Sequence, residues 1–260
     1  MQSPFDIAAD LDTPVSTWLK LAPLRPRYLL ESVEGGVHLA RYSFLGFGAV
    51  LEFRLDADGL QTGSGQRARP EGRDALLNAL RETLARAPRL APVVPDLPFS
   101  GGLVGVSAYD LVRHFERLPH APSHPDNPQV PEAAYLAAES LLVFDHLTRR
   151  IALLHAGTEA ERLQLRAGVI RLLRGAVPAA PVAGRQDSTG QSLSREQFLQ
   201  AVAASKASIS RGDVYQLVVS VQFTGTHSLA PFEAYRALRL LNPSPYMFFI
   251  DLGDIQVAGS

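Results

Sequence analysis

The sequence contains no cysteine and carries almost no net charge. Disulfides, thiolate metal sites and a cysteine nucleophile are therefore excluded. Its 25 basic and 26 acidic residues leave a net charge of -1, so no overall basic field exists to hold nucleic acid or an anionic membrane. We expect small-molecule or protein partners, with no nucleic acid and no membrane among them.

Long hydrophobic runs and common catalytic signatures are also missing. No apolar run reaches the ~18 residues that a membrane span needs, and residues 1–19 carry three aspartates and no signal-peptide pattern. The seven histidines are not paired at metal spacing, and no P-loop, dinucleotide fingerprint or G-x-S-x-G elbow is present. The sequence therefore predicts a soluble, cytoplasmic protein whose chain supplies no metal ligands.

What is present indicates an α+β protein. The chain has 260 residues, of which 46% are hydrophobic, enough for one large or two modest domains. Short apolar or alternating runs bounded by turn residues predict strands, and apolar residues at helical spacing predict helices. The expected strands are residues 27–32, 37–44 (after a turn at 34–36), 47–55, 60–62, 101–106, 137–145 and 150–155, and the expected helices are residues 73–86, 109–116 and 159–173.

A change of composition suggests a domain boundary. Residues 176–192 are rich in Ala, Pro, Gly, Ser and Thr, which is typical of a linker. Ser194 and Gln197 then form a capping box that begins a helix, and Gly212 fits the residue that ends it. We expect a first domain over residues 1–175, a linker over 176–192, and a second domain that begins at 193 and runs to 260.

Residues 214–223 alternate between apolar and mixed positions, which predicts a strand. Gln216 lies on the mixed face, which could line a cleft or be the half-solvated face of a sheet. A helix at 231–241 follows, and the prolines at 243 and 245 stop it. Strands at 246–251 and 255–258 bring the chain to its end inside a sheet, which would leave an unpaired edge and suggests truncation.

Five stretches, in order, resemble one known family. Leu29-Leu30-Glu31-Ser32 is followed after ten intervening residues by Ser43, and the later stretches are Gly101–Glu116, Gly212–Ser220, Tyr235–Arg239 and Asn242–Phe249. Together they are similar to anthranilate synthase component I, the large chorismate-using subunit, over roughly residues 25–260. The resemblance implies an α+β fold of antiparallel β-sheets packed face to face with helices outside.

The same resemblance implies a lyase of tryptophan biosynthesis. Chorismate and ammonia would give anthranilate and pyruvate, with Mg²⁺ as cofactor and a glutamine amidotransferase subunit, component II, as the ammonia source. In the family the chain continues past the position of Ser260, and the catalytic histidine and the magnesium carboxylates lie in that part. The resemblance therefore implies an amino-terminal fragment that is inactive alone.

The resemblance also implies a feedback site for L-tryptophan. The family's inhibitor residues correspond to Ser32 and to Pro245, Tyr246 and Met247. Glu31 or backbone carbonyls could accept hydrogen bonds from the ammonium, and Ser32 and Ser43 offer hydroxyls. The alternative is that Ser32 ends a strand and Pro245 turns the chain.

Gln216 is the candidate residue on the chorismate side. Relatives that add water to chorismate have a lysine at the matching position, whereas a glutamine amide cannot act as a base. The alternative is a buried amide with satisfied hydrogen bonds. Two other functions compete with anthranilate synthesis, namely aminodeoxychorismate synthase component I and a non-catalytic tryptophan-binding module.

Overall fold

The computed structural model describes residues 4–32, 41–63, 65, 67–118, 130–179 and 184–260. Their contacts form two compact units, one made of residues 1–179 and 235–260 and the other of residues 180–234. Each unit is described by itself. The predicted domain boundaries, with a first domain over residues 1–175 and a second from residue 193, stay predictions about the whole protein.

The first unit is built on a sheet in which all the described strand pairs are antiparallel. Its strand order is β1-β7-β6-β3-β2-β10-β11, with β4 on β3 and β5 on β6. This confirms the α+β class with antiparallel sheets. The strands are β1 (Ile7–Ala8), β2 (Pro26–Glu31), β3 (Tyr42–Asp56), β4 (Gly59–Thr62), β5 (Val104–Ser107), β6 (Ala133–Asp145), β7 (Arg150–His155), β10 (Met247–Asp251) and β11 (Gln256–Gly259).

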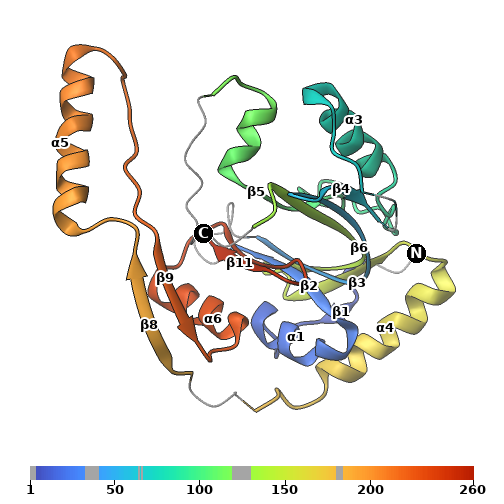
Figure 1. The fold of residues 1–260 in the computed structure, drawn as a ribbon. Helices are drawn as coiled ribbons and strands as arrows, with labels where there is room; N and C mark the ends of the chain where they lie inside the picture. Colours follow the sequence, from blue (N-terminus) through green and yellow to red (C-terminus); the bar gives the residue numbers. More distant parts are fainter. Residues whose placement is uncertain (1–3, 33–40, 64, 66, 119–129, 180–183) are drawn as a thin grey trace. The chain divides into compact units, whose positions relative to one another are not determined.

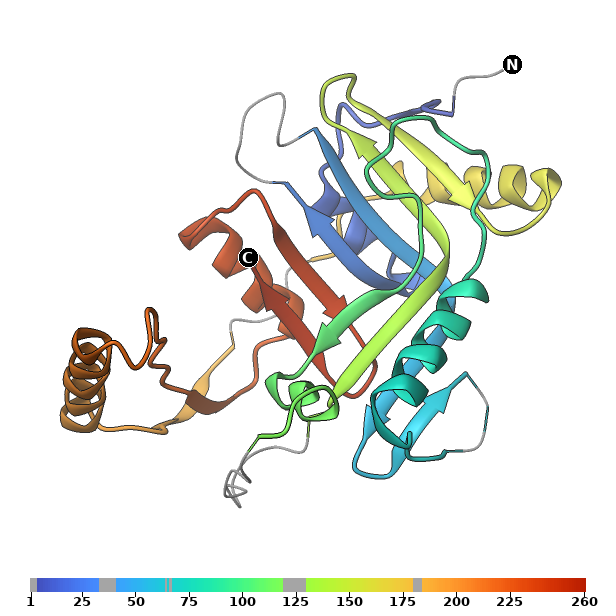
Figure 2. The ribbon, with the colours of Figure 1, turned by 90° about the horizontal axis from the view of Figure 1, so that it is seen from above.

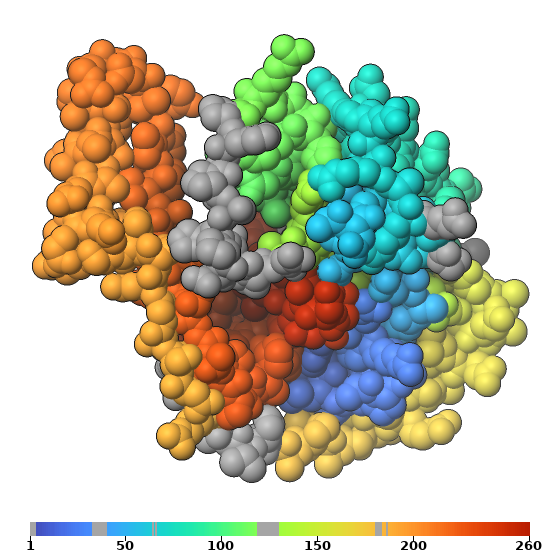
Figure 3. All heavy atoms as spheres, in the orientation of Figure 1, coloured from blue at the N-terminus to red at the C-terminus, as the bar shows by residue number. Residues whose placement is uncertain are grey.

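The sheet joins the two ends of the chain. Strand β10 pairs with β2 in the register Phe248↔Leu30 and Phe249↔Leu29. Figure 2 shows the red β10 and the blue β2 side by side, and the blue and red residues form one continuous surface in Figure 3. Residues 247–251 and 256–259 therefore extend a sheet whose other strands lie within residues 7–155.

Helices cover both faces of this sheet. Figure 1 shows α1 (Pro14–Lys20) and α4 (Glu159–Leu173) on one side, and α3 (Gly72–Ala85) on the other. Thr13 and Thr158 accept hydrogen bonds from backbone N–H groups at the first turns of α1 and α4, which stabilises both helix starts. Two short 3-10 helices, η1 (Ala22–Leu24) and η2 (Tyr109–His114), also belong to this unit. Helix α1 has no counterpart among the sequence predictions.

Strand β3 differs from its prediction. The sequence predicts two strands separated at residues 45–46, but the structure has one strand of 15 residues. The chain accommodates its length with a bulge between Phe47 and Val50, where Gly48 adopts a φ of 86° that a side chain would resist. The expected turn at 34–36 and most of the strand expected at 37–44 lie outside the described residues.

The second unit contains β8 (Gln186–Gln191), α5 (Arg195–Arg211), β9 (Phe223–His227) and the start of α6 (Pro231–Leu241). The capping box of Ser194 and Gln197 is confirmed, as is the left-handed Gly212 that ends α5. Strand β8 forms within the segment expected to be a linker, and it pairs with β9.

The strand predicted at 214–223 is also wrong. Only Phe223 belongs to a strand, and residues 214–222 are irregular. Tyr215 and Val218 are 94% and 77% exposed. The alternating pattern needs a neighbouring strand and a surface to pack on, and no described strand pairs with residues 214–222.

The close packing of Gly46 gives a test of this fold. A Cβ atom at Gly46 would lie 2.1 Å from Cζ of Tyr28, a ring that is 1% exposed. Overpacking of this kind costs about 1–3 kcal/mol, so Gly46→Ala should lower the free energy of unfolding by that amount. Urea denaturation followed by circular dichroism measures it.

The control is Gly168→Ala in α4, where a Cβ atom meets nothing within 4 Å. Because alanine favours helix over glycine, this change should raise stability by about 0.5–1 kcal/mol. Equal effects of the two substitutions would contradict the packing described for Gly46.

Candidate functional site

A cavity of about 800 Å³ lies where the end of β2, the start of β3, the segment before β5 and the start of β10 meet. We call it the β2–β10 cavity. Its walls are mainly apolar and aromatic. It is lined by Leu30, Glu31, Ser32, Arg41, Tyr42, Phe44, Pro98, Phe99, Leu103, Val104, Gly105, Val106, Tyr135, Pro245, Tyr246, Met247, Phe248 and Ile250.

Strand register explains how distant motifs meet at this cavity. Glu31 is paired with Met247 across the antiparallel strands β2 and β10. Ser32, directly after Glu31, and Tyr246, directly before Met247, therefore lie at the same end of the two strands. Side chains alternate along a strand. Leu30 and its partner Phe248 therefore share one face, whereas Glu31 and Met247 share the other.

The face behind the cavity holds a buried ion pair. The Glu31 side chain is 2% exposed, and its Oε2 accepts hydrogen bonds from the Tyr235 hydroxyl at 2.5 Å and from Nε of Arg239 at 3.0 Å. Nη2 of Arg239 donates to Oε1 at 3.2 Å. Burial, followed by the charge of Glu31, raises the pKa of Tyr235, so its hydroxyl stays protonated and donates. Both carboxylate oxygens of Glu31 are thus already engaged.

Ser43 lies in the same region and is 1% exposed. Its Oγ is 2.7 Å from Nε2 of His146. Burial lowers the pKa of His146, although the charges of Glu31 and Asp145 oppose that effect. A neutral imidazole with its proton on Nδ1 can accept a hydrogen bond from the Ser43 hydroxyl at Nε2.

Arg41 and Asp145 form a second ion pair at the cavity. Nε and Nη2 of Arg41 donate to the two oxygens of Asp145 at 3.2 and 3.0 Å. Burial alone would raise the pKa of Asp145, but Arg41 and the backbone N–H groups of Leu147 and Thr148 outweigh it and hold that pKa below its usual range. The Arg41 guanidinium also lies 4.8 Å from the centre of the Tyr42 ring.

The predicted site residues fall into three groups. Five of the six residues proposed for tryptophan line the β2–β10 cavity, namely Glu31, Ser32, Pro245, Tyr246 and Met247. Ser43 is not among the lining residues and contacts His146 instead. Sequence reasoning missed Arg41 and Tyr42, although both stand directly before Ser43 in the motif.

Gln216 lies in the second unit, within an irregular segment, and is exposed. The strand predicted at residues 214–223, whose mixed face would have pointed Gln216 into a cleft, does not form over residues 214–222. Its alternative, a buried and satisfied amide, does not match the exposed side chain either. A role for Gln216 in a chorismate cleft stays a prediction about the whole protein.

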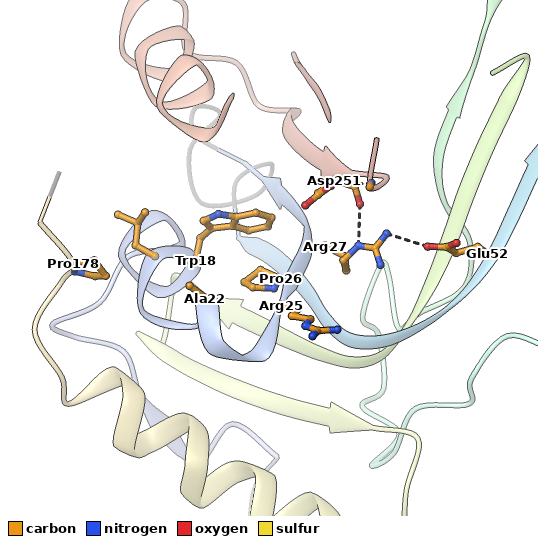
Figure 4. A pocket seen from close by; sticks show the side chains of 10 residues that line it. Trp18, Ala22, Arg25, Pro26, Arg27, Glu52, Pro178 and Asp251 are labelled. Atoms are coloured by element: carbon orange, nitrogen blue, oxygen red, sulfur yellow. Dashed lines mark hydrogen bonds and ion pairs between the residues drawn. The ribbon is translucent and has the colours of Figure 1, made fainter. Parts of the chain in front are cut away.

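A second pocket, of about 640 Å³, lies beside Trp18. Figure 4 shows Arg27 between Asp251 and Glu52, where it donates to the Asp251 carbonyl at 3.0 Å and to the Glu52 carboxylate at 3.1 Å. The polar groups at this wall therefore bind one another. None of the predicted tryptophan residues lines this pocket, so the β2–β10 cavity is the stronger candidate site.

No group of three or more His, Asp and Glu side chains that could hold a metal ion gathers among the described residues. The described helices include none that is both long and apolar enough to cross a membrane.

Comparison with known proteins fits this arrangement of motifs. The family described as chorismate binding enzyme matches residues 25–260. The chain belongs to this family. The match includes β2, β3 and β10, the strands that bring the motif segments to the cavity.

Curated relatives of this chorismate binding family member carry the name anthranilate synthase component 1. The protein from Thermus thermophilus is 41% identical over 251 residues, which cover 95% of the chain and 52% of the relative. The protein from Synechocystis is 36% identical, with 97% of the chain and 54% of the relative covered. The chain thus spans about half the length of the curated relatives it matches.

A solved structure has a similar fold. Anthranilate synthase component I from Streptococcus pneumoniae superposes with a TM-score of 0.66 at 25% sequence identity. The alignment covers 100% of this chain and 57% of that one. The resemblance stated from the motifs is therefore confirmed.

The ion pair behind the cavity gives a second test. Glu31→Ala leaves Arg239 and Tyr235 without their shared acceptor, and breaking a buried pair on one side costs about 3–5 kcal/mol. The free energy of unfolding, measured by urea denaturation, should fall by that amount. The double change Glu31→Met with Arg239→Met should be closer to neutral, since no buried charge is then left unpaired.

The matched control is Glu52→Ala, which breaks the ion pair between Glu52 and Arg27. This pair is more exposed, since the Glu52 side chain is 53% exposed. Exposed pairs contribute roughly 0–1 kcal/mol. A loss for Glu31→Ala no larger than for Glu52→Ala would show that Glu31 does not anchor α6 to the sheet.

Proposed function

We propose that this chain forms the tryptophan-binding part of an anthranilate synthase component I. The observation that carries the proposal is the β2–β10 cavity, which gathers Ser32 from one end of the chain and Pro245 and Tyr246 from the other. The relatives named anthranilate synthase component 1 support the same reading.

The proposed reaction belongs to the whole protein. It is a lyase reaction of tryptophan biosynthesis, in which chorismate and ammonia give anthranilate and pyruvate. Mg²⁺ is the proposed cofactor, and a glutamine amidotransferase subunit is the proposed source of ammonia. We propose a cytoplasmic location for this complex. The family match to chorismate binding enzymes supports the substrate.

The cavity has the chemistry that a bound tryptophan needs. Phe44 and Phe99, whose ring centres lie 5.3 Å apart, contribute aromatic surface against which an indole ring can pack. The Ser32 hydroxyl offers a hydrogen bond. Because the Glu31 oxygens are engaged by α6, backbone carbonyls are the acceptors we propose for the ammonium.

The ion pair behind the cavity offers a route for inhibition. A ligand that contacts the end of β2 also contacts the residues next to Glu31, and Glu31 holds Arg239 of α6. An effector acts by binding one of two conformations of the protein more tightly and so favouring that conformation. We propose that tryptophan favours one position of β2 relative to residues 235–241 of α6.

A second candidate is a non-catalytic tryptophan-binding module. The observation that favours it is that all the described lining residues belong to one unit of this chain. In that case tryptophan would bind to the 260-residue chain with no chorismate chemistry attached. An anthranilate fluorescence assay on the protein that contains this chain, with chorismate, Mg²⁺ and ammonia, separates the two candidates.

Ser32→Leu tests the tryptophan site. Losing a buried hydrogen bond costs about 1–3 kcal/mol, and filling the cavity with a larger side chain adds a similar amount. The dissociation constant for L-tryptophan, measured by calorimetry on the 260-residue chain, should rise at least about tenfold. Ser210→Leu, on the exposed surface of α5, is the control and should leave it unchanged. Unaltered binding by the Ser32 variant would refute this placement.

Gln216→Lys tests the proposed chorismate role in the whole protein. An amine can act as a base and activate water, whereas an amide cannot. The substitution should reduce ammonia-dependent anthranilate formation and admit water as a nucleophile, which chromatography of the products detects. Gln222→Lys, also in an exposed irregular position, is the control. If rate and products do not change, Gln216 has no such role.

A further inference from the structure

We propose that Arg41 binds the carboxylate of the amino acid in the β2–β10 cavity and so makes the cavity selective for amino acids over amines. This inference rests on the proposed function, because it names a residue of the same site. Ser32, the motif residue proposed above, supplies only a neutral hydroxyl.

The charge inventory of the cavity singles out Arg41. Among the described lining residues, only Glu31 and Arg41 carry a formal charge. Glu31 is held by α6 through both of its oxygens. Arg41 is therefore the one described lining residue that can give a carboxylate a charged partner.

The guanidinium of Arg41 is held in place by Asp145, which accepts hydrogen bonds from two of its three nitrogen atoms. One edge, formed by Nε and Nη2, donates to Asp145. Asp145 is itself 3% exposed and accepts from the Leu147 backbone N–H at 3.0 Å, so it is a fixed support. The Tyr42 ring, with its centre 4.8 Å from Cζ of Arg41, restricts the plane of the group further.

The other edge of the same guanidinium carries Nη1, and no described residue accepts a hydrogen bond from that edge. Arginine has five N–H donors, and a carboxylate can accept two of them side by side. Nη1 of Arg41 donates to no group in the part of the chain that the structure describes, and the side chain is 41% exposed. An arginine that donates to one carboxylate through Nε and Nη2 can thus bind a second carboxylate by donating from its Nη1–Nη2 edge. The ammonium of the same ligand keeps the added charge near zero.

The experiment compares two ligands that differ in the carboxylate alone. Calorimetry on the 260-residue chain would use L-tryptophan and tryptamine, which has the indole and the amine but no carboxylate. The unaltered chain should bind L-tryptophan at least about tenfold more tightly, since hydrogen bonds to charged groups are the stronger class. Arg41→Gln should remove most of this preference by weakening L-tryptophan binding and leaving tryptamine within about twofold.

Arg69→Gln is the matched control, because Arg69 also forms an ion pair, with Glu132, and does not line the cavity. It should change neither affinity. Equal binding of both ligands by the unaltered chain would overturn the inference without any substitution, and so would an Arg41→Gln variant that weakens both ligands equally. Absence of L-tryptophan binding by the unaltered chain would instead overturn the proposed function, and the role of Arg41 with it.

Discussion

The pairing of β2 with β10 is the constraint on which the rest of this structure depends. Four residue pairs, from Met247↔Glu31 to Ile250↔Tyr28, join segments from opposite ends of the chain. Because side chains alternate along a strand, this register decides which residues face the cavity and which face α6. A slip of one residue would exchange the two sets. The same few backbone hydrogen bonds therefore define both the wall of the cavity and the anchor of the helix behind it.

The polar residues behind the sheet explain why this register is specific. Glu31 finds its partners, Tyr235 and Arg239, only when β2 presents it to α6. An unpaired buried carboxylate is strongly unfavourable, whereas an apolar residue tolerates several positions. Trp18 adds apolar packing on this face, with its ring edge-on to Phe249 at 5.2 Å. Apolar packing holds the strands together, and the ion pair selects one alignment.

Local patterns predicted local elements well. The helix at 159–173 and the caps at Ser194 and Gly212 agree with the structure because their signals lie within a few neighbouring residues. The strand at 214–223 failed because alternation states a preference and cannot supply a partner strand. The motif resemblance predicted that Ser32 and Tyr246 belong to one site. It could not predict that Tyr235 and Arg239 already engage the Glu31 carboxylate, since that follows from the strand register and from residues of another element.

The position of β2 inside the sheet also governs the order of assembly. In the finished fold β2 lies between β3 and β10, so one of its edges stays unpaired until residues 247–251 exist. During synthesis, β3, β6 and β7 can form a platform on β2 long before that edge is covered. Pairing β2 with β10 brings together residues that are more than 200 positions apart, and such distant contacts form slowly. Until they form, the open edge of β2 can pair with another chain. The late arrival of β10 therefore makes the emerging polypeptide vulnerable to aggregation at the same edge that later shapes the cavity.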